Sequence, residues 1–430
     1  MPVRVIMSAL SITVACIMAE LHIPLDIKSL EILSQHINSK GEIILTVQSK
    51  KTETPCHKCG KPATSRYGYG PALTIRHLPI LDTPVYLVIK PVRYKCNDCD
   101  DLITTSESYD WLKRGAHVTN GLSDYLMRQL IHSTIEDVSI KERIGYKQLE
   151  NTVNKAIDIQ VNWQSYTSLS LLGIDEIALK KGHKDYVTVI STKPEKTAQV
   201  TVIAVLPGRL KKDVAAFLKT IPENLRKTIQ SVCTDMYDGF VFAVTEVLGD
   251  AVLVVDRYHV AKLYRQPLDK LRVREMKRLK STLSEEKYAQ LEGVMWTLRK
   301  KHECLSDAEK ETLVLLYHYS PKLKEAHSHA LRLTQILNTH CSKKSGLAKI
   351  NRWIKRVKKS DSTCFNGFLI TLEKYKTYVG NYFKNRSNSG FVEGLNNLIK
   401  VAKRRCYGIF KTETLFQRLY LDLQGFEIYA

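Results

Sequence analysis

The segment Leu169-Ser-Leu-Leu-Gly-Ile-Asp175 is an apolar run of strand length that ends at a carboxylate. Two later segments repeat this arrangement, since 228–234 leads into Asp235 and 251–255 leads into Asp256. Further strands are expected at 186–191 and 199–206, and helices at 210–220 and 237–248. The order of these elements predicts an α/β fold built on a mixed sheet.

Asp175 and Asp235 end the first and the fourth expected strand. Side chains at the carboxyl ends of strands lie at the edge of the sheet, where open α/β folds bind ligands. Two neighbouring carboxylates repel one another unless a cation neutralises them. Mg²⁺ needs few carboxylates beside water and substrate phosphate, so these two and one further acid would suffice for a two-metal site. Glu176 alternates to the other face of its strand and is left out of this set.

The third acid lies in Val392-Glu-Gly-Leu-Asn-Asn-Leu-Ile-Lys400. A helix over 391–405 would bury Leu395, Leu398, Ile399 and Ala402 and would present Glu393, Asn396, Asn397, Lys400 and Arg404 on its other face. A carboxylate, amides and cations on one face suit a metal ion beside a DNA backbone, which Lys400 and Arg404 would contact. An amphipathic helix with a solvated face is the alternative.

Four of the ten cysteines form two C-x-x-C pairs, Cys56 with Cys59 and Cys96 with Cys99, separated by 36 residues. Two such pairs can complete a tetrahedral four-cysteine site for structural Zn²⁺. Two local disulfides or a redox C-x-x-C motif are the alternatives. A strand pattern at 42–48 leads into this module, and a further one at 85–89, between the cysteine pairs, predicts a small β-rich ribbon.

The region from 121 to 157 has a helical pattern. Helices over 134–143 and 147–157 would flank the turn Ile144-Gly-Tyr146, in which Gly145 would supply a positive φ. This spacing is typical of a helix-turn-helix, whose second helix would present Lys147 and Asn151 to DNA. Short helical hairpins also occur in many folds that do not bind DNA.

Charge is distributed unevenly along the 430 residues, which suffice for roughly two to four domains. The chain has 65 Lys and Arg against 44 Asp and Glu, a net charge of +21. Residues 1–250 hold 30 basic and 27 acidic side chains, whereas 251–430 hold 35 and 17. The basic half, including long basic helices expected between 257 and 386, predicts a polyanionic partner such as DNA, with an anionic membrane surface as the rival.

No run reaches the roughly 18 apolar residues that span a bilayer. The uncharged stretch 5–19 follows Arg4 as in a secretory signal, but no clear cleavage site follows it, and Met18 is an alternative start to Met1. We expect a cytoplasmic, nucleoid-associated protein without a membrane partner.

Four motifs together resemble the DDE transposases of bacterial insertion sequences. They are Leu172-Gly-Ile-Asp-Glu-Ile-Ala-Leu-Lys-Lys-Gly-His183, Thr234-Asp-Met-Tyr237, Val255-Asp-Arg-Tyr-His-Val-Ala-Lys262 and Val392-Glu-Gly-Leu-Asn-Asn-Leu-Ile-Lys400. With the cysteine pairs in front of them, they most resemble the ISL3 family, from about residue 50 to the C-terminus. The second cysteine pair departs from the wider spacing typical of that family.

The resemblance implies an RNase H-like mixed-sheet core interrupted by an all-helical insertion and preceded by a zinc ribbon and a helix-turn-helix. The corresponding boundaries are a lead segment 1–50, a zinc ribbon 51–105, a helix-turn-helix region 106–165, a first core part 166–256, a basic helical insertion 257–386 and a C-terminal core part 387–430.

The same resemblance implies a catalytic triad of Asp175, Asp235 and Glu393 that holds two Mg²⁺ ions, with Mn²⁺ as a substitute. The activity would be cleavage and strand transfer of double-stranded DNA at terminal inverted repeats, with a homo-dimer or higher oligomer joining two ends and a target. Asp256 competes with Asp235 for the triad or caps a helix, and His259 could contact phosphate, support an acid or be structural. A catalytically silent DNA-binding regulator and an RNase H-like nuclease without strand transfer are the alternative functions.

Overall fold

The computed structural model describes residues 25–99, 103–179, 185–193, 200–250, 252–386, 390–409 and 411–429. The chain forms two compact units, Met1–Asp124 and Tyr125–Ala430, and the boundary falls within helix α1 (Asn120–Leu130). The signal-like stretch 5–19 and Met18 lie outside the described residues. Among the described helices, none is both long enough and apolar enough to cross a membrane.

A four-stranded sheet forms the larger part of the first unit. Its strand order is β1 (Leu30–Ile37), β2 (Ile43–Ser49), β7 (Thr83–Ile89) and β6 (Leu73–Ile80). Val85, Leu87 and Ile89 alternate onto the buried face of β7, where Val47 and Trp111 share their core. The strands expected at 42–48 and 85–89 are therefore confirmed.

The cysteines belong to a separate small sheet group of the first unit. It consists of the sheet β5 (Ser65–Tyr69), β8 (Val92–Lys95) and β9 (Thr104–Ser106), with the pair β3 (Thr54–Pro55) and β4 (Pro62–Ala63). The fully buried Tyr94 packs with the cysteines. The expectation of a single ribbon that includes 85–89 was wrong, because β7 pairs with β2 and β6 instead.

Helices α2 (Ile135–Lys141) and α3 (Tyr146–Ala156) open the second unit after α1. The side chain of Thr134 caps α2, and α3 buries Leu149 and Val153. Both helices confirm the helical pattern. The turn differs from expectation: Arg143 takes the positive φ of 49°, whereas Gly145 has φ −60° and ψ 135°, because it is the extended N-cap of α3.

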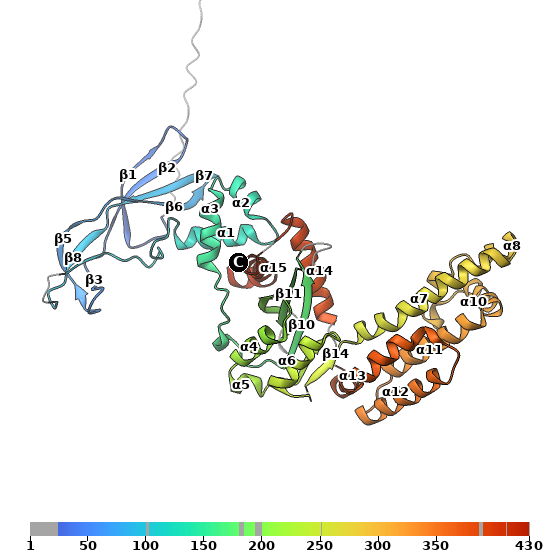
Figure 1. The fold of residues 1–430 in the computed structure, drawn as a ribbon. Coiled ribbons are helices and arrows are strands. Elements are labelled where there is room, and N and C mark those ends of the chain that lie inside the picture. Colours follow the sequence, from blue (N-terminus) through green and yellow to red (C-terminus); the bar gives the residue numbers. More distant parts are fainter. Residues whose placement is uncertain are drawn as a thin grey trace, which may run out of the picture. The chain divides into compact units, whose positions relative to one another are not determined.

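The second unit contains a five-stranded sheet in the order β12, β11, β10, β13, β14 (Figure 1). The strands are β10 (Leu171–Ala178), β11 (Tyr186–Thr192), β12 (Thr201–Pro207), β13 (Ser231–Thr234) and β14 (Leu253–Val255). The first three pair antiparallel, and β13 and β14 add to β10 in parallel. This mixed α/β architecture agrees with the fold class expected from the apolar runs.

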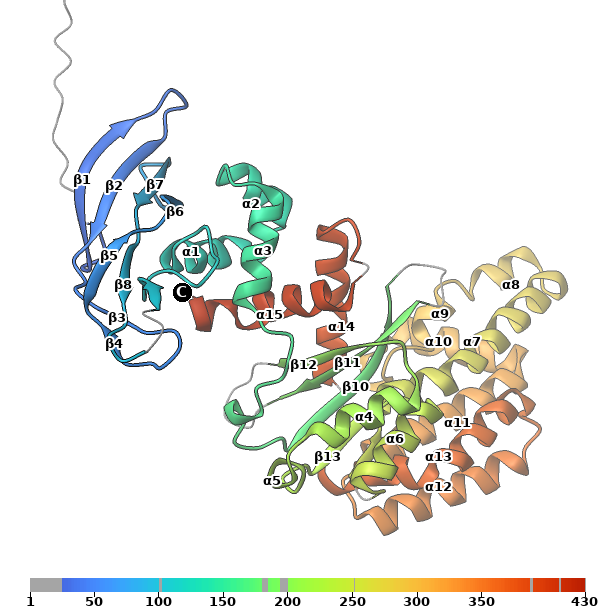
Figure 2. The same cartoon turned by 60° about the vertical axis from the view of Figure 1, so that its left-hand side comes forward.

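Helices pack on both sides of this sheet (Figure 2). They are α4 (Lys211–Thr220), α5 (Glu223–Arg226) and α6 (Asp238–Leu248) between strands, and α14 (Gly390–Arg405) and α15 (Thr412–Tyr429) at the C-terminus. Gly173 explains the approach of α14, because a Cβ there would lie 2.5 Å from Val392 Cγ2 and 2.9 Å from Phe391 Cζ. A glycine on β10 thus lets the helix that carries Glu393 lie directly on the strand that carries Asp175.

Every described element between 257 and 386 is helical. They are α7 (Arg257–Thr282), α8 (Glu285–Ala289), α9 (Val294–Thr297), α10 (Asp307–Tyr319), α11 (Pro321–Asn338), α12 (Lys343–Lys358) and α13 (Asn366–Asn385), with short 3₁₀ turns between some of them. Trp353, Phe365 and Phe368 form edge-to-face contacts inside this bundle. The buried aromatic core shows that the basic segment is a packed helical body rather than a tail.

Candidate active site and candidate zinc centre

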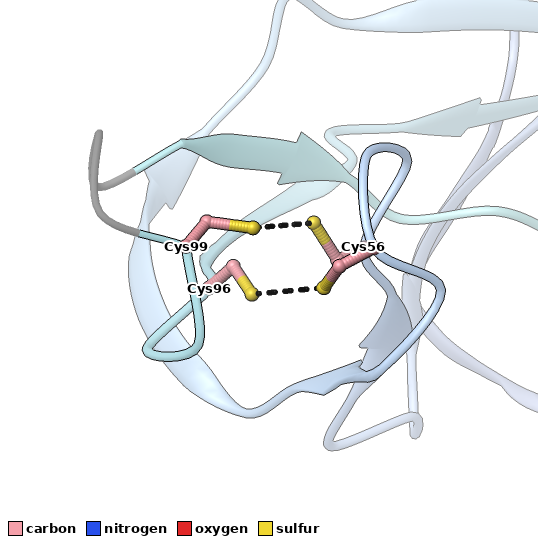
Figure 3. Close-up of side chains that lie close together, drawn as sticks. Cys56, Cys96 and Cys99 are labelled. Atoms are coloured by element: carbon pink, nitrogen blue, oxygen red, sulfur yellow. Dashed lines mark hydrogen bonds between the residues drawn. The ribbon is translucent and has the colours of Figure 1, made fainter.

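The two C-x-x-C pairs meet in space, as Figure 3 shows for Cys56, Cys96 and Cys99. All four Sγ atoms lie within 4.8 Å of one another, with Cys56 to Cys99 at 3.9 Å and Cys59 to Cys96 at 3.6 Å. A tetrahedral Zn²⁺ with Zn–S bonds of about 2.3 Å requires Sγ separations of about 3.8 Å. The cysteine geometry therefore fits zinc, and the spacing of the second pair does not prevent it.

The electrostatics of the thiols also suit a cation. Backbone N–H groups of Cys59 and Lys58 lower the pKa of the Cys56 thiol to about 6. Hydrogen bonding with Cys59, together with burial, raises the pKa of Cys99 to about 12. A bare cluster resists a full set of thiolates, whereas a bound dication favours it. His57 is not part of the cluster, because its Nδ1 lies 2.9 Å from Thr105 Oγ1.

The aspartates lie side by side on parallel strands of the second unit. Ile174 pairs with Thr234, so the next residues, Asp175 and Asp235, are neighbours across β10 and β13. The expectation that Asp175 ends its strand was wrong in detail: β10 continues to Ala178 because it keeps pairing with β11. Asp175 is instead the first residue beyond the parallel pairing with β13.

Asp175 is buried and Asp235 is half-buried, and each carboxyl group has a raised pKa. Burial raises the pKa of Asp175, while hydrogen bonds from Asn396 and from the Glu176 N–H partly offset that effect. Burial and then the charge of Asp175 raise the pKa of Asp235 to about 6. Asp235 Oδ1 accepts a hydrogen bond from the Tyr237 N–H at 3.1 Å. A pair of adjacent carboxylates with raised pKa values is typical of functional sites.

Asp256 follows β14 and lies next to Asp235 in the sheet, because Thr234 pairs with Val255. Its Oδ1 accepts a hydrogen bond from the Tyr258 N–H at 3.0 Å and so caps α7, as the helix-capping alternative predicted. His259 Nδ1 lies 3.6 Å from Asp256 Oδ2, and the charge of His259 lowers the pKa of both Asp175 and Asp235. His259 therefore lies beside Asp256 and acts electrostatically on the other two aspartates.

Helix α14 reaches the aspartates through Asn396, whose Nδ2 donates to Asp175 Oδ2 at 2.6 Å. Lys403 Nζ also donates to the Ala178 carbonyl at 2.5 Å, which fixes the helix along β10. Asn396 was expected on the polar face of this helix, but its bond to Asp175 was not. Glu393 lies three residues, about one turn, before Asn396 on the same helix.

Glu393 itself is exposed. In the described part of the chain, no hydrogen bond or ion pair joins its carboxylate to Asp175 or Asp235. The structure thus brings the two aspartates together and sets Glu393 on the neighbouring helix face. Lys400 and Arg404 are exposed on the same helix, and Lys147 and Asn151 are exposed on α3.

Glu176 and Arg209 are site residues that the sequence interpretation did not include. Arg209 Nη1 donates to Glu176 Oε2 at 2.8 Å, and its guanidinium lies over the rings of Tyr186 and Tyr237 at 4.5 and 4.8 Å. The charge of Glu176 contributes to the raised pKa of Asp235. Strand alternation argued against Glu176, and no local pattern pointed to Arg209, which arrives from the end of β12.

Comparisons with known proteins match two regions of the chain. Residues 172–419 match the family DDE_Tnp_ISL3, described as transposase, and residues 52–99 match a family described as the zinc-finger of transposase IS204/IS1001/IS1096/IS1165. The matched ranges contain the three candidate acids and all four cysteines.

Individual relatives cover most of the chain. The transposase for insertion sequence element IS1001 of Bordetella parapertussis is 25% identical over 374 residues, which is 86% of this chain and 89% of the relative. The transposase for insertion sequence element IS1557 of Mycobacterium tuberculosis is 21% identical over 391 residues, 86% of each chain. The first family match alone spans more than half of the chain. The resemblance seen in the sequence motifs is confirmed, and the chain belongs to the ISL3 family of DDE transposases.

Proposed function

We propose that this transposase cleaves DNA at the terminal inverted repeats of its insertion sequence and joins the freed 3′ ends to target DNA. The observation that carries the proposal is the pair of neighbouring carboxylates, the buried Asp175 and the half-buried Asp235, placed by two adjacent parallel strands in a chain that belongs to a transposase family. The strand order, with three antiparallel strands followed by two parallel ones, supports an RNase H-like core. That core would comprise 166–256 and 387–430, with 257–386 as its insertion.

Asp175, Asp235 and Glu393 are the residues that would hold two Mg²⁺ ions or Mn²⁺. The carboxylates suit hard oxygen-preferring cations, and the cost of keeping Asp175 and Asp235 ionised side by side falls when a dication lies between them. Bound in this way, two metal ions supply a polarised water or hydroxyl nucleophile and charge stabilisation for the leaving oxygen. The remaining contribution of the protein to the reaction would be to position the DNA strands at this site.

Asn396 has a positioning role in this proposal. Its amide fixes one oxygen of Asp175 and leaves Oδ1, which accepts the Glu176 N–H at 2.8 Å, at the edge of the sheet. Glu393 lies one turn earlier on the same helix and would turn toward the aspartates when cations bind. Asp256 and His259 would support the site, Asp256 by capping α7 and His259 by its proximity to the two catalytic aspartates.

Recognition of the element's ends is assigned to the N-terminal half of the chain. Helices α2 and α3 within 106–165 would act as a helix-turn-helix, with Lys147 and Asn151 exposed on the second helix. The cysteine site within 51–105 would hold structural Zn²⁺ and stiffen its sheet. Lys400 and Arg404 would contact phosphates beside the catalytic carboxylates, and the basic insertion would hold DNA and a second protomer when two ends are brought together.

The test is incubation of the purified protein with DNA that carries the element's own ends, with Mg²⁺ or with EDTA. We expect nicking at the element boundary and joining of the freed 3′-OH to target DNA with Mg²⁺ only. Binding to the ends without nicking would favour the silent regulator. Nicking without joining would favour a nuclease.

A further inference from the structure

A cavity of about 700 Å³ lies within the helical segment, between α7, α11 and the chain around α9. Helices α7 and α11 lie side by side along it (Figures 1 and 2). Its size is within the range of pockets that hold a small molecule or one unit of a polymer. None of the proposed catalytic acids lines the cavity, so it is a site of its own.

Apolar and polar side chains both line the interior of the cavity, and the polar ones include Thr334, whose hydroxyl lies 2.7 Å from that of Tyr264. Ala261, Leu298 and Leu331 form half-buried walls. His327 is 4% exposed and its Nδ1 lies 2.6 Å from the Tyr317 hydroxyl. The other ring nitrogen, Nε2, is buried, and the backbone of Leu298 hydrogen-bonds with the ring. His327 is therefore a buried part of the cavity wall.

Burial lowers the pKa of His327, so the ring is neutral at pH 7. With one nitrogen engaged by Tyr317 and the other buried, the ring forms a neutral part of the wall. A slot with apolar side chains and a neutral ring in its walls suits a flat heteroaromatic ring, and it does not suit an anion.

The mouth of the cavity is strongly basic. Its cations are Lys262, Arg265, Lys270, Arg272, Arg299, Lys300 and Lys301. The acid among the lining residues, Asp269, is already paired with Arg272 at 2.8 Å and lies 3.6 Å from Arg299. In the described chain, no ion pair is formed by Lys262 or Arg265, both of which are exposed. Unpaired cations around an apolar slot combine affinity for phosphate with affinity for a base.

We infer that this cavity binds one unpaired nucleotide of the DNA, with its base in the apolar slot beside His327 and its phosphate at Lys262 and Arg265. The inference rests on the proposed function, because it presupposes that the chain binds DNA. A base that is stacked and paired in an intact duplex is not free to enter the slot, whereas an extrahelical base exposes both its ring faces and its pairing edge. The cavity therefore selects distorted or frayed DNA over intact duplex.

The test compares two probes with the full-length protein in EDTA, which prevents cleavage. One probe is a short fluorescein-labelled duplex, and the other is the same duplex with one central unpaired adenine. Anisotropy titrations at one salt concentration should give about tenfold tighter binding of the bulged probe, because its unpaired base needs no unstacking. Leu331→Trp, which fills the slot, should reduce this preference to nearly onefold and leave duplex affinity unchanged.

A second pair of variants keeps the inference testable if Leu331→Trp fails to fold. Lys262→Gln with Arg265→Gln should weaken binding of the bulged probe more than binding of the duplex. Lys277→Gln with Lys280→Gln removes the same charge from exposed positions of α7 outside the cavity and should weaken both probes equally.

Two results overturn the inference in different ways. Equal affinity of the wild-type protein for both probes, or a preference that persists in Leu331→Trp and in the Lys262 and Arg265 variant, would refute the nucleotide site while leaving the proposed DNA binding intact. Absence of binding to either probe would refute the proposed function itself, and the nucleotide site with it.

Discussion

Replacing Asp235 by asparagine should stabilise the metal-free protein while abolishing its activity. In the folded chain the pKa of Asp235 is raised to about 6 by burial and by the charge of Asp175, against an ordinary value of 3.8. The ionised carboxylate therefore destabilises the fold by about 2–3 kcal/mol at pH 7.5. The asparagine side chain in Asp235→Asn would carry no charge, and its amide oxygen can still accept the hydrogen bond from the Tyr237 N–H.

The stability of the fold depends on pH because the pKa of Asp235 is raised in the folded state. Between pH 3.8 and about 6 the folded state binds more protons than the unfolded state, so the wild-type protein loses stability as the pH rises through this window. The increase in the free energy of unfolding that Asp235→Asn gives over the wild-type protein should be largest at pH 7.5 and should fall to about half at pH 5. Added Mg²⁺ should stabilise the wild-type protein and leave the variant nearly unchanged.

The assay is urea denaturation in EDTA at pH 7.5 and pH 5, followed by circular dichroism. Asp361→Asn, which changes an exposed carboxylate far along the chain, is the control and should alter the free energy of unfolding by less than about 0.5 kcal/mol. Two results would refute this reasoning. Either Asp235→Asn is no more stable than the wild-type protein, or its free energy of unfolding rises equally at pH 7.5 and pH 5. Both would mean that the neighbouring carboxylates do not destabilise the fold.

Three further predictions concern the zinc centre, the DNA-reading helix and the contact under α14. Protein kept in reductant should contain about one zinc per chain by metal analysis, and Cys59→Ser should lose it. Alanine at both Lys147 and Asn151 should reduce the preference for element ends over random DNA by about tenfold in competition binding, with an unchanged fold. Gly173→Ala should cost about 1–3 kcal/mol in unfolding experiments and should impair cleavage more than DNA binding, because its Cβ would displace Val392. The matched control is Gly394→Ala on α14, where an added Cβ has open space. It should neither lower the free energy of unfolding nor impair cleavage.

Local sequence patterns were sufficient to predict much of the fold. The apolar runs around Asp175 and Asp235 predicted the strands, and parallel pairing then required that the two acids be neighbours. The spacing of Cys56, Cys59, Cys96 and Cys99 predicted a cluster because thiols on two tight turns can converge on one point. These features depend on short-range periodicity, which a sequence displays directly.

The remaining features depend on long-range packing. The bond from Asn396 to Asp175 joins residues 221 positions apart, and the helix pattern alone could not select its partner. Arg209 reaches Glu176 from the chain that follows β12, and its guanidinium lies over the rings of Tyr186 and Tyr237. The pairing of β7 with β2 was also hidden, since a strand pattern does not specify its neighbour.

The central claim is that Asp175, Asp235 and Glu393 form the catalytic triad, and Glu393 is its least constrained member. The most direct measurement is cleavage and strand transfer on the element's own ends by Glu393→Gln and Asp256→Asn, each beside the wild-type protein. Gln keeps the size of the side chain and the buried face of α14, but it removes one anionic ligand that Mg²⁺ prefers. We predict loss of cleavage and joining in Glu393→Gln, with DNA binding retained and partial recovery in Mn²⁺, and a milder defect in Asp256→Asn. Wild-type cleavage by Glu393→Gln, or complete loss in Asp256→Asn beside an active Asp235→Asn, would contradict the assignment of the triad.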